Sequence, residues 1–69
     1  MNLHLECEQE EDGRWLAEVP ELPGVLAYGA SRFEALSRTE ALALRVIADR
    51  LEHGESQAMS LEVKLPVAS

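Results

Sequence analysis

The stretch that decides the fold of this chain is the turn sequence Val19-Pro20-Glu21-Leu22-Pro23-Gly24-Val25. Proline has no backbone N–H and moves the residue before it out of the helical region, whereas glycine permits a positive φ. Two prolines and a glycine in so short a stretch predict a stiff, ordered turn that interrupts a strand. We therefore interpret Pro20, Pro23 and Gly24 as structural residues.

Two strands are predicted before this turn. From Asn2 to about Glu10, apolar and polar residues alternate with the period of two that marks a strand with one buried and one wet face. Asp12-Gly13 is a hairpin turn signal, and the alternation resumes from Arg14 to Val19. The pair is predicted to form an antiparallel hairpin.

A third strand and a helix are predicted after the turn. Val25 to Tyr28 is short and apolar and is closed by Gly29, as expected for the last strand of an antiparallel meander. Ser31 is placed to cap a helix, and Glu34, three residues later, completes a capping box that satisfies two amide donors. Gly54 is expected to follow the helix end as a left-handed residue.

The predicted helix has an apolar stripe suited to packing on a sheet. Its members are Leu36, Ala43, Leu44, Ile47 and Leu51. A short final strand, Leu61 to Leu65, is stopped by Pro66. The order predicts a single α+β domain over residues 1–69, β-β-β-α-β, in which a right-handed helical crossover covers one face and the final strand returns parallel to the first.

The size and composition limit what this chain can do alone. A domain of 69 residues buries roughly 60% of the surface that its unfolded chain exposes. Because 46% of the residues are hydrophobic, we expect self-association, as a dimer or tetramer, or a partner protein. The lone Cys7 and the absence of a signal-like or long apolar segment predict a cytoplasmic protein without a membrane span.

The charge is concentrated in the first part of the chain. The formal net charge is −7, and residues 1–24 hold seven acidic residues against one base, a net charge of −6. Such a segment repels phosphates and attracts a basic partner, which disfavours direct nucleic-acid binding by this chain alone. The alternative interpretation is that the acidity serves only solubility.

No catalytic, metal or cofactor site is predicted, and we do not expect an enzyme. Glu6 and Glu8 share a wet strand face, but the sequence shows no further ligands that converge on them. His4 and His53 belong to different elements. Cys7 is in phase with buried strand positions and is interpreted as a core residue.

Three large apolar residues have open assignments. Trp15 is favoured to pack under the helix, although an aromatic side chain in an acidic hairpin could instead anchor a partner. Leu16 is out of phase with its neighbours and Leu22 lies on the turn. We expect both leucines to be exposed and covered by self-association.

The hairpin turn around Gly13, the Pro20 to Gly24 turn, Tyr28-Gly29 and the helix start Ser31 to Ala35 together resemble the HicB family of antitoxins. The resemblance covers about residues 3–54. It implies a partial ribonuclease H-like fold and neutralisation of HicA, a small basic toxin that cleaves messenger RNA. Acidic candidates for contact with such a partner are Glu8, Glu10, Glu11, Asp12, Glu18 and Glu21.

Many members of the HicB family also have a segment that binds operator DNA. The sequence after the predicted helix shows no helix-turn-helix or ribbon-helix-helix pattern, so we expect no operator binding by this chain alone. The alternative function is that of a solitary oligomeric module of the same fold, structural or regulatory, with no toxin partner.

Overall fold

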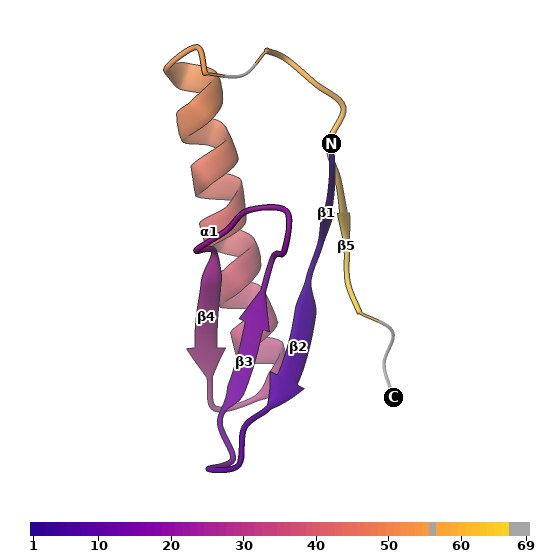
Figure 1. The fold of residues 1–69 in the computed structure, drawn as a ribbon, viewed down its shortest axis with the longest axis vertical. Coiled ribbons are helices and arrows are strands. Elements are labelled where there is room, and N and C mark those ends of the chain that lie inside the picture. The colour runs from indigo at the N-terminus through magenta and orange to yellow at the C-terminus, as the bar shows by residue number, and fades with distance from the viewer. Residues whose placement is uncertain (56, 67–69) are drawn as a thin grey trace.

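The computed structural model describes residues 1–55 and 57–66, and its elements form two layers, a set of strands and one helix (Figure 1). The elements in chain order are β1 (Asn2–His4), β2 (Glu6–Gln9), β3 (Trp15–Glu18), β4 (Leu26–Gly29), α1 (Arg32–Glu52) and β5 (Glu62–Lys64). β2, β3 and β4 form an antiparallel meander, and β5 pairs with β1 in parallel. The predicted α+β order and the place of the final strand are confirmed.

The first predicted strand is divided into β1 and β2 because it changes its pairing partner at Leu5. β1 pairs with β5, and β2 pairs with β3 on the other edge. β3 ends at Glu18, where the chain enters the turn, so it cannot continue alongside β1. Leu5 joins the two ladders by donating its N–H to the carbonyl of Lys64 at 2.9 Å.

The turn at residues 19–25 is ordered as predicted. Val19 donates to the carbonyl of Val25, Val25 donates to Leu22 and Leu22 donates to Val19, each at 3.0 Å. Gly24 has a φ of +89°, which a residue with a Cβ rarely adopts. The turn therefore folds back on itself and closes the end of the sheet.

Leu22 corrects one prediction, because its side chain is only 1% exposed. The turn lies over the end of the core and places this leucine inside, so the expectation of an exposed Leu22 was wrong. Leu16, by contrast, is half-buried on the opposite face of the sheet. Trp15 and Cys7 are partly buried and pack against the core, in line with their predicted packing roles.

The core lies between the sheet and α1. It consists of Leu3, Leu5, Ala17, Val19, Leu22, Val25, Ala35, Leu36, Ala43 and Ile47. Thr39 is fully buried among these residues and donates its hydroxyl to the carbonyl of Ala17 at 3.1 Å. A buried hydroxyl without a partner would be unfavourable, and this hydrogen bond satisfies it while tying the helix to the central strand β3.

Both predicted ends of the helix are confirmed. The Ser31 hydroxyl accepts the N–H of Glu34 at 3.1 Å, and the Glu34 carboxylate accepts the N–H of Ala30 at 3.0 Å, one residue before the cap itself. At the other end Gly54, with a φ of +71°, donates to Leu51 and the following Glu55 donates to Arg50. These two bonds form a Schellman motif.

The buried face of α1 differs from the predicted stripe. Leu36, Ala43 and Ile47 are buried, but Leu44 and Leu51 are 41% and 40% exposed. The prediction that these two leucines pack on the sheet was wrong. Ala35 and Thr39 complete the buried face, and no prediction had identified either of them.

Gly29 lies at a close approach between the sheet and the helix. A Cβ added at this position would lie 2.5 Å from the backbone nitrogen of Ala35 and 3.0 Å from its Cα. The residue is therefore required by packing and not only by the end of the strand. This contact positions the first turn of α1 against β4.

Candidate functional site

No described element covers the face of the meander that points away from α1 (Figure 1). In the strand register, Glu6 lies opposite Glu18 and Glu18 lies opposite Leu26. The next row places Glu8 opposite Leu16 and Leu16 opposite Tyr28. We call this surface the open face, and its members are Glu6, Glu8, Leu16, Glu18, Leu26 and Tyr28.

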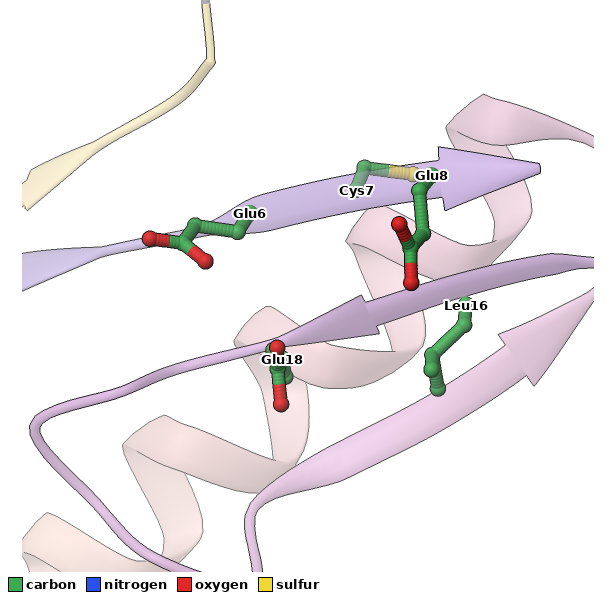
Figure 2. Close-up of a pocket in the computed structure, with 5 residues that line it drawn as sticks. All are labelled: Glu6, Cys7, Glu8, Leu16 and Glu18. Carbon is green, nitrogen blue, oxygen red and sulfur yellow. The ribbon is translucent and has the colours of Figure 1, made fainter. Parts of the chain in front are cut away.

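The open face contains a shallow hollow of about 150 Å³, lined by Glu6, Cys7, Glu8, Leu16 and Glu18. Figure 2 shows the three carboxylates on the same side of the sheet, with α1 behind it. Like charges directly opposite each other across a strand pair are destabilising. None of these carboxylates forms an ion pair with another residue in the part of the chain that the structure describes.

Arg14, the one base of the first 24 residues, contacts Asp12 and Tyr28. Its backbone N–H donates to Asp12 Oδ1 at 3.0 Å and its Nε donates to Asp12 Oδ2 at 2.7 Å. Its guanidinium carbon lies 4.5 Å from the centroid of the Tyr28 ring, a cation–π contact. Arg14 therefore pairs with Asp12 of the hairpin turn and forms no ion pair with the carboxylates that line the hollow.

The structure separates the six acidic residues that were predicted as partner contacts. Glu8 and Glu18 lie together on the open face, whereas Glu10, Glu11 and Asp12 belong to the hairpin turn and Glu21 lies in the turn at residues 19–25. Asp12 is bonded to Arg14, and both of these bonds hold the pKa of its carboxyl below the ordinary value of 3.8.

Glu6 was not among the predicted contacts but lies on the open face with Glu8 and Glu18. The strand alternation already placed Glu6 on the same side as Glu8, so the sequence held the signal. The prediction grouped the acidic residues by chain segment and not by strand face.

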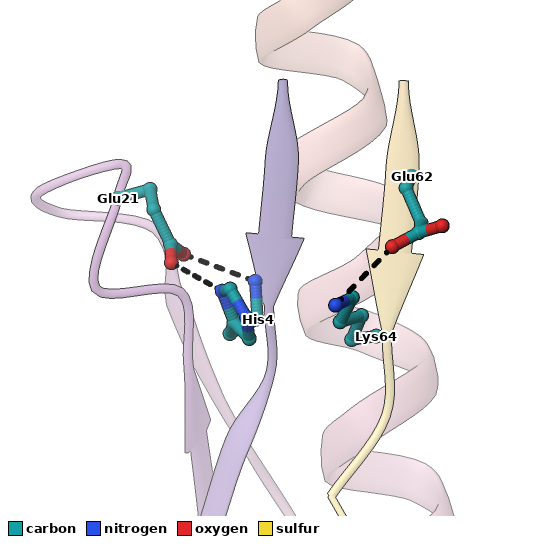
Figure 3. Close-up of polar contacts among 4 residues, drawn as sticks. All are labelled: His4, Glu21, Glu62 and Lys64. Atoms are coloured by element: carbon teal, nitrogen blue, oxygen red, sulfur yellow. Dashed lines mark hydrogen bonds and ion pairs between the residues drawn. The ribbon is translucent and has the colours of Figure 1, made fainter. Parts of the chain in front are cut away.

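Glu21 has a local structural partner (Figure 3). Its Oε1 accepts the backbone N–H of His4 at 3.0 Å, and its Oε2 lies 2.6 Å from His4 Nδ1. The N–H of His4 lies on the edge of β1 opposite β5, where β3 has already ended. The Glu21 carboxylate therefore accepts a hydrogen bond that a neighbouring strand would otherwise accept. The bond from the backbone and that from the side chain of His4 both hold the pKa of Glu21 below its ordinary value of 4.5.

The lowered pKa of Glu21 predicts a pH-dependent contribution to stability. The ionised carboxylate is favoured in the folded chain, so its contribution is present above about pH 4.5 and is lost as the pH falls through the lower folded value. We expect Glu21→Gln to reduce the change in stability between pH 5 and pH 3, measured by urea unfolding. Glu11→Gln, in the hairpin turn, is the control, and equal pH profiles for the two variants would contradict the role of Glu21.

The remaining candidate reactive groups have ordinary structural surroundings. Burial raises the pKa of the Cys7 thiol, which opposes formation of a thiolate. His53 is exposed at the end of α1, where its Nδ1 lies 2.8 Å from the carbonyl of Asp49. Among residues 1–55 and 57–66 there is no group of three or more metal-ligating side chains that could hold an ion.

No helix within the described ranges is long and apolar enough to cross a membrane. Comparison of the chain with models of protein families, with curated proteins and with solved structures gave no match in any of the three.

Proposed function

We propose that this protein is an antitoxin-like module of the cytoplasm that binds and neutralises a small basic toxin of the HicA kind, an RNA-cleaving protein. The observation that supports this proposal most strongly is the uncompensated acidic hollow on the open face. Glu6 and Glu18 face each other across β2 and β3 with no cation of the described chain between them. A basic partner would relieve this repulsion on binding.

The surroundings of the hollow suit a protein partner better than a small ion. Leu26 and Tyr28, on the neighbouring strand, are 43% and 40% exposed. Apolar and aromatic side chains beside charged groups are typical of the centre of a protein interface. The partner is expected to insert a lysine or arginine into the hollow and to pack an apolar side chain against β4.

Binding at this face would block RNA cleavage by direct competition. A small RNA-cleaving protein must hold phosphates with basic side chains, and carboxylates compete for the same cations. The wild-type chain, mixed with the toxin before RNA is added, is expected to abolish cleavage near stoichiometric amounts. Undiminished cleavage in the presence of excess protein would reject the proposal.

Removing two carboxylates of the open face is expected to weaken toxin binding without lowering the stability of the fold. Glu6→Gln with Glu18→Gln should weaken toxin binding by about 10- to 100-fold, because charge-assisted contacts are lost. The same change removes a like-charge pair and should leave stability unchanged or raise it by about 0.2–1 kcal/mol. Calorimetric titration measures the affinity and urea unfolding measures the stability.

A matched control for this prediction is Glu11→Gln with Glu52→Gln, which makes the same change of charge away from the open face. This control should retain the wild-type affinity within about twofold, after the general effect of net charge on association is taken into account. Equal weakening by both pairs of substitutions would mean that only the overall charge matters and would contradict a specific role of the open face.

The second candidate function is a solitary oligomeric module. It is favoured by a different observation, the large apolar side chains exposed on α1. In that case a copy of the same chain, and not a toxin, would be recovered from the cytoplasm with the protein.

A further inference from the structure

The outward surface of α1 is divided lengthwise into an apolar and a charged half. Phe33 is 79% exposed, and Leu44 and Leu51 are exposed on the same side. Small exposed residues lie between these three side chains. At about 3.6 residues per turn, the whole set occupies an arc of about 80° around the helix axis. We call this surface the α1 stripe, and its members are Phe33, Ser37, Ala41, Leu44, Ala48 and Leu51.

The spacing within the α1 stripe is that of a coiled-coil seam. From Ser37 onwards its members are separated by four, three, four and three residues, which is the a/d pattern of a heptad repeat. Ala41 and Ala48 take the a positions, and Leu44 and Leu51 take the d positions. Small residues alternating with leucines allow two helices to approach closely.

The charges beside the stripe define how a second helix would pair with it. Glu40 lies on one flank and Arg45 on the other, five residues further along, at the g and e positions. Neither forms an ion pair with any other residue that the structure describes. In a parallel pair of identical helices, each Glu40 faces Arg45 of the other copy, whereas an antiparallel pair places Glu40 beside the flank that holds the other Glu40.

We propose that a second copy of this chain covers the α1 stripe and forms a parallel two-fold pair of α1 helices. The two sheets then lie on the outer sides of the pair, because the stripe is on the part of α1 that points away from the sheet. Each dimer contains two ion pairs between Glu40 and Arg45 of different copies. The open face stays accessible on each copy.

Two other surfaces are poorer candidates for self-association. Two copies joined through the open face would bring six carboxylates together, and the base beside this face, Arg14, is already paired with Asp12. The free edge of β4 is partly occupied, because Arg38 Nη1 donates to the carbonyl of Tyr28 at 3.0 Å. A carbonyl on the edge of β4 that is bonded to Arg38 is less able to pair with another strand.

Exchanging the charges of Glu40 and Arg45 tests both whether the dimer forms and whether its two α1 helices are parallel. We expect Glu40→Arg and Arg45→Glu, each alone, to raise the dimer dissociation constant by about 5- to 10-fold, because each places like charges at both contacts. The double variant should return within about twofold of the wild type. Sedimentation equilibrium measures the constant, and a wild-type chain that stays monomeric, or a double variant that is no tighter than the single ones, overturns the proposal.

Disulfide trapping gives an independent readout that does not depend on changes in charge. In a Cys7→Ser background, Ala48→Cys places a thiol at an a position and is expected to form covalent dimers rapidly under mild oxidation. Asp49→Cys, one residue along on the charged half, is the matched control. Equal trapping of both variants, or trapping only in a mixture of Ala41→Cys with Ala48→Cys, contradicts the parallel pair.

Discussion

Replacing Gly29 by alanine is expected to lower the free energy of unfolding by about 3 kcal/mol or more, since overpacking against rigid atoms is costly. The added Cβ would lie 2.5 Å from the backbone nitrogen of Ala35, which cannot turn away as a flexible side chain could. A domain of this length is expected to have a total stability of roughly 3–10 kcal/mol. Urea unfolding followed by circular dichroism should therefore show a large fall in the unfolding midpoint, and a variant that is unfolded without urea if the wild-type stability is near the lower end of this range.

Gly13→Asn is the control for this prediction. Gly13 has a φ of +93° and no atom within 4 Å of an added Cβ, so only the local backbone is affected. Asparagine tolerates left-handed conformations better than other residues with a Cβ, and the expected loss is about 1 kcal/mol or less. If Gly29→Ala were as mild as this control, the close approach between β4 and α1 would not limit the fold.

Replacing Leu22 by alanine is expected to lower the free energy of unfolding by about 2–5 kcal/mol, the range found when a buried leucine leaves a cavity. Leu22 is 1% exposed, although it belongs to a turn between two prolines. Its side chain closes the end of the core next to Val19 and Val25. Thermal and urea unfolding of the variant measure this effect.

Leu65→Ala is the matched control, because it makes the same change of side chain at a position that is 60% exposed. A surface substitution of this kind is expected to change stability by at most about 0.5 kcal/mol. Similar losses for Leu22→Ala and Leu65→Ala would contradict the placement of Leu22 in the core.

Local chemistry made much of the fold predictable from the sequence. Ser31 and Glu34 identify the start of α1 because a hydroxyl and a carboxylate at that spacing satisfy free amide groups. Gly54 identifies its end because the left-handed Schellman position favours glycine. The strands of the meander were also predictable from local sequence, because apolar and polar residues that alternate with a period of two assign each side chain to one face of a strand.

The features that were not predicted depend on contacts between distant parts of the chain. The division of the first strand at Leu5 follows from where β3 ends, which the sequence of β1 and β2 does not encode. Leu44 and Leu51 lie in an apolar pattern that fits either the sheet or a second helix, and periodicity alone cannot choose between them. The direction of the Leu22 side chain depends on how the turn closes over the core.

The candidate site was predicted in part. Glu8 and Glu18 were identified from the local charge excess, but Glu21 is used to hold β1 to the turn. The alternation placed Glu6 on the same strand face as Glu8, but its position opposite Glu18 follows only from the register. Charge counting along a chain finds an acidic segment, whereas the strand register decides which acidic residues share a surface.

We propose that the open face binds a basic toxin. The most direct test is capture from a lysate of the native cells with two baits, the wild-type chain and the Glu6→Gln/Glu18→Gln variant, followed by identification of the eluted proteins and their stoichiometry. We predict that the wild type retains a small basic protein in equal amount and that the variant loses most of it. Recovery of the bait alone, or equal retention by both baits, would contradict the claim.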